Sequence, residues 1–239
     1  MRLRLRPPLR LRPRPPLRLS PRPLPRRPRA TRRPPDAAIA SAAPPVPFVG
    51  LTGGIGAGKS TALAELARLG AAVLSTDAVV HGLYGTDAVR DAVVDRWGPE
   101  VAPGGEVDRA AVAARAFATP ADRRWLEELL WPQVGAAIAA WREEALAADP
   151  PPRALVVEVP LLFESGMDAA FDATIAVVAD EGLRTERAAA RGHAALDERT
   201  ARQLPQSEKA ERATHVAVND GAVEDLAANL SAILVKLTE

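Results

Sequence analysis

Short apolar runs alternate with longer stretches of helical period along most of this chain. The runs carry apolar residues at successive positions, which is typical of strands that are buried on both faces in a parallel sheet. We expect strands at 46–51, 71–75, 154–159, 174–179 and 215–218. We expect helices at 62–70, 78–97, 108–118, 121–147, 183–191, 197–203, 207–214 and 223–237. This alternation predicts an α/β fold, a three-layer α/β/α sandwich around a five-stranded parallel sheet.

The helices expected between the second and third strands form a long insertion at 78–147. The last of them has apolar residues spaced for one helix face. Pro132 should kink this helix, because proline lacks the backbone N–H that continues the hydrogen-bond pattern. We expect Trp97, Trp125 and Trp141 to lie in the core of this region.

Residues 1–35 have a different composition, with 13 Arg, 11 Pro, 7 Leu and no acidic residue. Proline at this density blocks helices and strands, so we expect 1–45 to be a disordered tail and linker before a folded domain at 46–239. Three interpretations of the tail stay open: an arm that binds nucleic acid or an anionic surface, a transit peptide, and a stretch translated from a misassigned start codon. We favour the last, because the strong preference for Arg over Lys indicates a GC-rich genome.

The rest of the chain carries 18 Lys and Arg against 30 Asp and Glu. Such an acidic domain lacks the basic surface of a duplex-binding protein, so we expect no nucleic-acid partner for it. The sequence has no cysteine, which excludes disulfides and thiolate chemistry, and no apolar run long enough to span a bilayer. We expect a cytoplasmic protein without membrane contact that is a monomer or a weak homo-oligomer.

A glycine-rich segment between the first expected strand and helix fits the pattern G-x-x-x-x-G-K-[ST]. Glycines let backbone N–H groups approach phosphate oxygens closely, and the following helix adds the positive end of its dipole. Lys59 is placed to reach the β- and γ-phosphates, the Ser60 hydroxyl to bind Mg²⁺, and Thr61 to contact the α-phosphate. The pattern predicts a nucleoside triphosphate with magnesium, bound by Gly53, Gly54, Ile55, Gly56, Ala57, Gly58, Lys59, Ser60 and Thr61.

Two carboxylates follow expected strands at the edge of the sheet where this segment opens. Asp77 comes just after the second strand and is a candidate base that takes the proton of an acceptor hydroxyl, but its position equally fits a helix N-cap. Glu158 ends the apolar part of the third strand. A carboxylate there is a candidate magnesium ligand, and the alternative is a cap of the following turn.

Arg184, Arg187 and Arg191 lie at the i, i+3 and i+7 positions of one expected helix. Arginines on a segment that closes over a nucleotide neutralise the charge of the transferring phosphoryl group and help to exclude water. We expect this catalytic role for Arg187 and Arg191, and a solvent-exposed basic face for Arg184. The three histidines lack metal-ligand spacing, and we assign none of them to catalysis.

The pattern as a whole resembles the dephospho-coenzyme A kinase family. The matching pieces follow one another in the family's order over 46–239, nearly all of the expected domain. They are 50–61, 77–81, 117–120, 158–166, 202–209 and 219–221. The glycine-rich segment is common to many kinases, whereas the Pro-Leu-Leu-Phe-Glu and Gln-Leu-Pro…Glu-Lys segments are far more specific.

The resemblance implies a P-loop, nucleotide-kinase-like fold and ATP- and Mg²⁺-dependent phosphorylation of the ribose 3′-hydroxyl of dephospho-coenzyme A. It implies that Asp77 is the catalytic carboxylate and that Asn219 belongs to the nucleotide site. The region 78–147 would bind the acceptor, and about 184–209 would contain the lid. Another P-loop nucleoside or small-molecule kinase and a nucleotide-binding regulatory protein without turnover stay as alternatives.

Two positions depart from the family's pattern. Ser75 stands where the family usually has an acidic residue, so Asp77 has no like charge two positions before it. Trp131 stands where the family usually has a histidine before the proline. An imidazole is thereby replaced by a larger ring with only one hydrogen-bond donor, which bears on acceptor binding.

Overall fold

A computed structural model describes residues 45–190 and 203–239, which all belong to the unit Ala43–Glu239. The expected tail up to residue 44 lies outside the described residues, as do Arg191 and nearly all of the helix expected at 197–203. None of the helices in the described part combines the length and the apolar character that crossing a bilayer requires.

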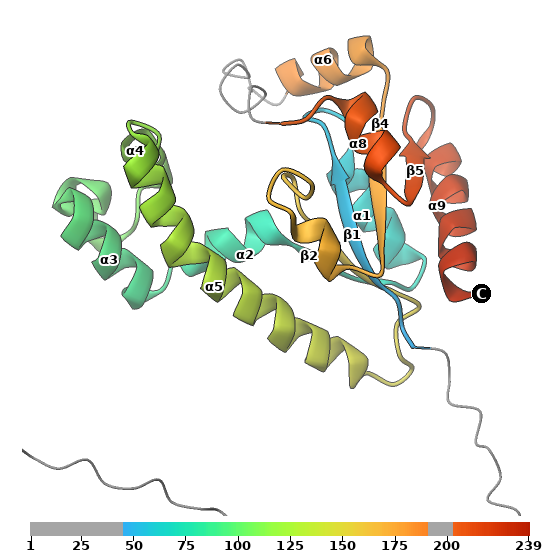
Figure 1. Ribbon diagram of the computed structural model, residues 1–239, viewed down its shortest axis with the longest axis horizontal. Helices are drawn as coiled ribbons and strands as arrows, with labels where there is room; N and C mark the ends of the chain where they lie inside the picture. Colours follow the sequence, from blue (N-terminus) through green and yellow to red (C-terminus); the bar gives the residue numbers. More distant parts are fainter. Residues whose placement is uncertain (1–44, 191–202) are drawn as a thin grey trace, which may run out of the picture. The chain divides into compact units, whose positions relative to one another are not determined.

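Within 45–190 and 203–239, five parallel strands form one sheet in the order β2-β3-β1-β4-β5 (Figure 1). Their bounds are β1 (Phe48–Gly53), β2 (Ala72–Ser75), β3 (Leu155–Glu158), β4 (Ala173–Val178) and β5 (His215–Val218). Each strand lies within two residues of its expected range, because a strand buried on both faces needs a continuous apolar run. The predicted α/β fold with a five-stranded parallel sheet is confirmed.

Helices fill the connections between the strands (Figure 1). The α-helices are α1 (Lys59–Arg68), α2 (Thr76–Leu83), α3 (Asp87–Trp97), α4 (Arg109–Ala116), α5 (Pro120–Leu146), α6 (Glu181–Ala190), α8 (Gln206–Arg212) and α9 (Val223–Thr238). Short 3₁₀ helices are η1 (Pro99–Val101), η2 (Pro103–Gly105) and η3 (Met167–Ala170).

The helical region differs from the expected helices at the end of α2. The single helix expected at 78–97 is wrong, because the chain turns between α2 and α3. Thr86 begins α3 there, and its Oγ1 accepts a hydrogen bond from the Val89 amide at 3.4 Å. Pro132 lies inside α5, which is one helix of 27 residues, and the kink expected there stays a prediction.

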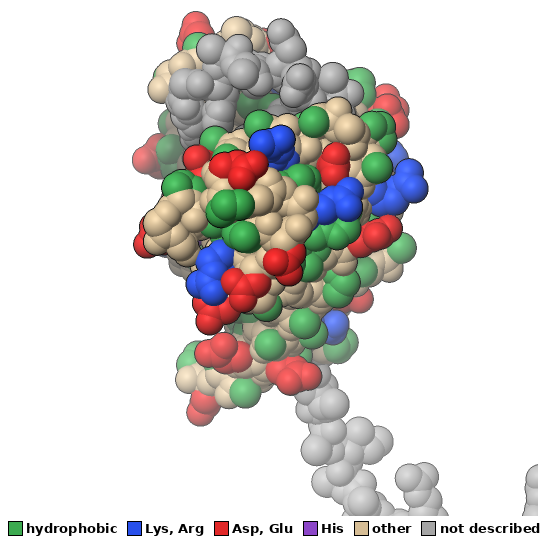
Figure 2. Space-filling view, turned by 90° about the vertical axis from the view of Figure 1, so that its left-hand side faces the viewer, with side chains coloured by type: hydrophobic (Ala, Val, Ile, Leu, Met, Phe, Trp, Pro, Cys, Tyr) green, Lys and Arg blue, Asp and Glu red, His purple; other side chains and the backbone are tan. Residues whose placement is uncertain are grey.

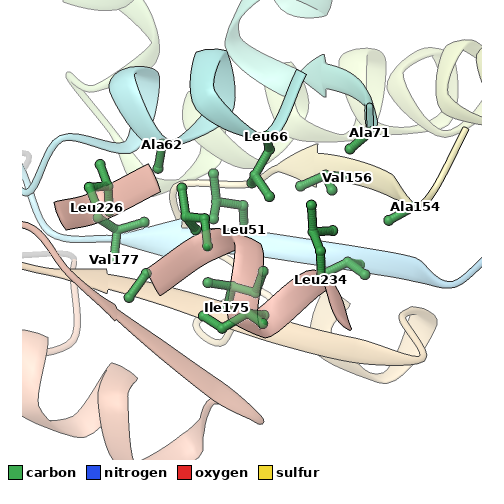
Figure 3. Packing of buried hydrophobic residues seen from close by; sticks show 14 of the residues in the cluster. Leu51, Ala62, Leu66, Ala71, Ala154, Val156, Ile175, Val177, Leu226 and Leu234 are labelled. Carbon is green, nitrogen blue, oxygen red and sulfur yellow. The ribbon is translucent and has the colours of Figure 1, made fainter. Parts of the chain in front are cut away.

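One face of the sheet is covered by α1 and α9, which also contact each other. Successive strand residues point to opposite faces, so alternate residues of β1 and β4 meet these helices. Leu51, Ile175 and Val177 pack there against Leu66 of α1 and Leu234 of α9 (Figure 3). Burial of each such side chain contributes roughly 1.5–3 kcal/mol. This packing holds the strands from whose ends the candidate site is built.

The opposite face of the sheet is covered mainly by α5 and by the chain that follows β3. Phe48 of β1 points to this side and packs with Val134 and Ile138 of α5. A third cluster joins α2 to α5 within the helical region, where Trp97 and Trp125 meet edge to face with ring centroids 5.0 Å apart. The three expected layers are therefore present, and α5 connects the sheet to the helical region.

Candidate active site

The register of the sheet brings three strand ends together. Glu158, the last residue of β3, pairs with Leu51 of β1 on one side and with Ser75 of β2 on the other. The glycine-rich loop leaves β1 just beyond Leu51, and Asp77 follows Ser75 by two residues. The candidates therefore emerge side by side at the carboxyl edge of the sheet, where α/β proteins bind their ligands.

The glycine-rich loop is packed tightly between two other segments. Gly58 begins α1 with a φ of 93°, and a Cβ at this position would overlap the side-chain amide of Asn219. Gly56 has a φ of 76°, and a Cβ there would overlap the backbone of Arg184. Both positions require a left-handed backbone and a close approach, which only glycine allows without strain.

Asn219 extends from the end of β5 toward this loop. Its side chain is buried, and its Nδ2 donates a hydrogen bond to the Ala57 carbonyl at 2.9 Å. Its own backbone carbonyl accepts a hydrogen bond from Arg187 Nη1 at 3.0 Å. Asn219 therefore stabilises the glycine-rich loop through its hydrogen bond to Ala57. Its contact with a nucleotide stays a prediction.

Lys59 lies at the start of α1 with its ammonium group turned back onto the loop. Its Nζ donates to the carbonyl oxygens of Gly53 at 3.1 Å and Gly54 at 3.2 Å. Burial lowers the pKa of Lys59, because the group is largely removed from the water that solvates its charge. The negative charge of a bound triphosphate would offset this loss of solvation.

Among the residues that the structure describes, four charged side chains act on the Lys59 ammonium group. After burial, the carboxylate of Glu158 has the largest effect, and together with Asp77 it raises the pKa of Lys59. Two cationic groups lower this pKa further. The four groups come from four elements: Glu158 from β3, Asp77 from α2, Lys209 from α8 and Arg184 from α6. The fold thus gathers two acids and three cations around one loop.

Glu158 and Ser60 are the two residues predicted to hold magnesium. Glu158 is buried at the end of β3, and Ser60 is exposed in the first turn of α1. Carboxylate and hydroxyl oxygens are ligands that Mg²⁺ accepts, and the ion completes its shell with water and phosphate oxygens. The two donors fit an ion shared with a triphosphate. The described residues hold no group of three or more His, Cys, Asp or Glu able to bind a metal without such a ligand.

Asp77 is exposed in the first turn of α2. The N-cap residue of α2 is Ser75, so the alternative that Asp77 is the N-cap is wrong. A carboxylate in the first turn still interacts favourably with the helix dipole. Its exposure beside the loop leaves it accessible to an acceptor, and its role as a base stays a prediction.

Helix α6 presents two arginines to the loop and its neighbours. The side chain of Arg184 is 14% exposed, and its Nε donates to the Ile55 carbonyl at 3.1 Å while its Nη1 pairs with Glu181 at 2.7 Å. The solvent-exposed role expected for Arg184 is therefore wrong, since this helix face turns toward the loop. Arg187 is half-buried and bonds Asn219, whereas Arg191 lies outside the described residues.

A family model described as dephospho-CoA kinase matches residues 47–225. The chain belongs to the dephospho-CoA kinase family. The match begins just before β1 and ends in α9, so it includes every candidate residue of the site.

Relatives named dephospho-CoA kinase agree with this membership. One from Anaeromyxobacter dehalogenans is 42% identical over 197 residues, which cover 79% of this chain and 91% of the relative. One from Deinococcus radiodurans is 40% identical over 195 residues, with the same two shares. The crystal structure of TT1252 from Thermus thermophilus has a TM-score of 0.68 and 34% identity, covering 81% of this chain and 99% of that chain.

In the described part of this member of the dephospho-CoA kinase family, two of the cavities lie along α2. The first has a volume of about 120 Å³ and a mainly apolar lining, which includes Val80, Phe117, Leu126, Leu130 and Trp131. The second, of about 300 Å³, has a more polar lining, which includes His81, Tyr84, Arg90, Glu106 and Arg109. Figure 2 shows the molecule from the side of the helical region, where apolar and charged side chains are interspersed.

The first cavity lies close to the candidate base along α2. Val80 follows Asp77 by three residues, and side chains three apart on a helix lie on one face. Trp131, which departs from the family's pattern, is 59% exposed at this cavity. A ligand in the cavity would therefore contact Trp131 and lie within one helical turn of Asp77.

No role in the site was predicted for Arg184, Glu164 or Lys209. The signal for Arg184 was its i, i+3 spacing with Arg187, which places both on one helix face. Glu164 and Lys209 lie in the two segments most specific to the family, yet no local pattern indicates that they form an ion pair. In the structure they do, with Lys209 Nζ 2.8 Å from Glu164 Oε1.

Proposed function

We propose that this protein uses ATP and Mg²⁺ to phosphorylate the 3′-hydroxyl of dephospho-CoA, giving CoA and ADP in the last step of CoA biosynthesis. The observation that carries the proposal is the register of the sheet, which places the strand end before Asp77 beside Glu158, and Glu158 beside the start of the glycine-rich loop. Transfer to a hydroxyl needs a base near the lysine that contacts the β- and γ-phosphates. Membership of the family supports dephospho-CoA as the acceptor.

The nucleotide would lie along the glycine-rich loop. The backbone N–H groups of 53–61 and the α1 dipole would bind its phosphates, and Lys59 would leave its carbonyl partners for phosphate oxygens. Ser60 and Glu158 would hold Mg²⁺, which supplies positive charge against the β- and γ-phosphates. Lys59 is well suited to this exchange, because its present acceptors are neutral carbonyls.

The arginines of α6 would add positive charge around the transferring phosphoryl group. Arg184 already lies against the loop, with its guanidinium group next to Gly54. Arg187 is one helical turn further along α6, and its Nη1 donates to the backbone carbonyl of Asn219. Charge-assisted bonds to phosphate are stronger than bonds to a neutral carbonyl, so a nucleotide would compete well with the carbonyl acceptors of Arg184 Nε and Arg187 Nη1.

The acceptor would lie between Asp77 and the first cavity. Its hydroxyl would donate a proton to the Asp77 carboxylate as the γ-phosphoryl group is transferred. The apolar lining of the cavity, with Phe117 and Trp131, would contact the uncharged part of the acceptor. A cytoplasmic location, a monomeric or weakly associated state and a lid within about 184–209 stay predictions.

An assay of ADP release with ATP and Mg²⁺ across a panel of acceptors tests the proposal. We expect dephospho-CoA to stimulate release, and product analysis to find the new phosphate on the 3′-oxygen. Stimulation by a nucleoside but not by dephospho-CoA would contradict the proposed acceptor. Nucleotide binding without turnover of any acceptor would favour a regulatory role.

The role of Asp77 has a matched control in Asp87, since both are acidic residues in the first turn of neighbouring helices. We expect Asp77→Asn to lower kcat by roughly 10²-fold or more, the scale of a general base. Asp87→Asn should leave kcat unchanged. Equal rates for the two variants would show that Asp77 is not the base.

A further inference from the structure

Lys209 in α8 is a charged side chain with no exposed surface. Its Nζ forms an ion pair with Glu164 Oε1 at 2.8 Å, donates to the Pro160 carbonyl at 2.8 Å and lies 3.4 Å from Thr52 Oγ1. An ammonium group has three N–H donors, and each is thus assigned to one acceptor. The direction of the group is therefore fixed by three separate segments.

These segments belong to the candidate active site. Thr52 directly precedes the glycine-rich loop, and Pro160 follows Glu158, the candidate magnesium ligand, by two residues. Glu164 Oε1 also accepts a hydrogen bond from the Leu204 amide at 2.8 Å, just before α8. One buried cation thus connects the end of β1 with the chain that leaves β3.

Helix α8 is also fixed to the end of β4. Gln206, the first residue of α8, accepts a hydrogen bond from the Ala179 amide at 2.9 Å and donates one to the Ala179 carbonyl at 2.8 Å. Ala179 lies between β4 and α6, the helix that carries Arg184. Lys209 therefore acts from a helix that is itself held at the carboxyl edge of the sheet.

We propose that Lys209 is a positioning residue for phosphoryl transfer, which holds the glycine-rich loop and the Glu158 strand end in the relative position that the reaction needs. The inference rests on the proposed function, because that function gives these two segments their ligands. A purely structural site does not require the charge, since apolar side chains often replace a buried ion pair without loss of stability. A cation with three hydrogen-bond acceptors in fixed directions restricts the relative position of the glycine-rich loop and the Glu158 strand end more than a non-directional apolar contact would.

The test compares Lys209→Met with Lys209→Met/Glu164→Gln. The single variant leaves a buried carboxylate without its partner, so lost activity in it could reflect unfolding alone. The double variant leaves no unpaired charge, and we expect its melting temperature to return close to that of the wild type. Its kcat should stay roughly 10–100-fold low, the scale of a small misplacement of reacting groups, while the KM for ATP changes less than about threefold.

Lys236→Met is the matched control, because Lys236 is the exposed third lysine of the chain. It should have wild-type kcat and KM. A double variant that is folded and has wild-type kcat would overturn the proposal, as would one in which only the KM for ATP rises. Recovery of kcat together with the melting temperature would reduce Lys209 to a structural residue.

Amide hydrogen exchange gives a readout that does not depend on the acceptor. In the ligand-free double variant, we expect exchange at 53–58 and 161–164 to be at least about tenfold faster than in the wild type and in Lys236→Met. Unchanged exchange at both segments would overturn the positioning role. A wild type that does not turn over dephospho-CoA would instead contradict the proposed function, and the exchange result would still decide the role of Lys209.

Discussion

Two lysines near the carboxyl edge of the sheet, the partly buried Lys59 and the buried Lys209, differ in their hydrogen-bond acceptors. Burial lowers the pKa of both Lys59 and Lys209. Lys59 donates to two neutral carbonyls of its own loop, whereas Lys209 has the carboxylate of Glu164 at 2.8 Å. The Lys59 ammonium group is therefore available to the negative charge of a ligand. The Lys209 ammonium group is already paired with the carboxylate of Glu164.

The difference shows that a lysine can serve ligand binding, as we propose for Lys59, or hold segments of the fold together, as Lys209 does. A hydrogen bond to a carboxylate is roughly twice as strong as one to a neutral carbonyl, so Lys209 is held firmly. Lys59 loses less when it exchanges its carbonyl partners for phosphate oxygens. The partly buried charge of Lys59 is thus unfavourable in the free protein and favourable once a negatively charged ligand is bound.

The largest effect is expected for Lys59→Met, which removes the ammonium group from the loop. Turnover should fall by about 10²-fold or more, because the β- and γ-phosphates lose a charge-stabilising group. The melting temperature of the ligand-free protein should stay the same or rise, since burial disfavours the charged form of Lys59 in the folded state. Steady-state kinetics and thermal unfolding at neutral pH measure the two quantities. A large loss of stability would show that Lys59 resembles Lys209.

The next effect concerns stability and separates Lys209 from Lys59 directly. Lys209→Met should lower the free energy of unfolding by about 3–5 kcal/mol, because it leaves the buried Glu164 carboxylate without its partner. Urea denaturation measures this, with Lys236→Met as the control that should change it little. If Lys209→Met and Lys59→Met have the same free energy of unfolding, the contrast between the two regions is lost.

The charge of Glu164 should make the stability of the Lys209 region depend on pH. Burial opposes ionisation of Glu164, but the hydrogen bonds from Lys209 and the Leu204 amide outweigh it and lower the pKa of the carboxyl group. A lowered folded-state pKa adds stability above the unfolded-state value, and this stability is lost as pH falls through the folded-state pKa. The advantage of wild type over Glu164→Gln should therefore shrink below about pH 4.3.

Urea denaturation between neutral and acidic pH measures this advantage. Glu211→Gln is a suitable control, because Glu211 is exposed on the same helix as Lys209. Its free energy of unfolding should follow that of the wild type at every pH. An advantage over Glu164→Gln that stays constant down to the acid limit would contradict ionic pairing as its source.

The smallest effect is expected from deletion of the N-terminal tail, which contains neither lysine. Removal of 1–42 deletes the Arg- and Pro-rich sequence and leaves the unit Ala43–Glu239. Both kcat and the free energy of unfolding should be unchanged within error. A salt-sensitive loss of activity on deletion would instead indicate that the tail binds an anionic partner that the reaction needs.

Much of the fold was predictable because its signals are local. A buried parallel strand needs a short apolar run, so the five strands were found within two residues of their ends. The helix expected at 78–97 was wrong because its apolar positions continue across the turn at 84–86, where Thr86 starts a new helix. Similarly, the spacing of Arg184 and Arg187 showed a shared face but not the direction in which that face points.

The glycine-rich loop and its lysine lie within nine successive residues, 53–61. Such a local pattern can be recognised in the sequence without knowing which distant residues contact it. The contacts of Lys209, in contrast, come from residues that are far away in the sequence. Thr52 lies 157 positions away along the chain, and only the order and register of the strands bring it to the buried ammonium group. Because burial and pairing depend on distant segments, the folded chain determines that Lys209 is paired inside the protein while Lys59 is left for a ligand.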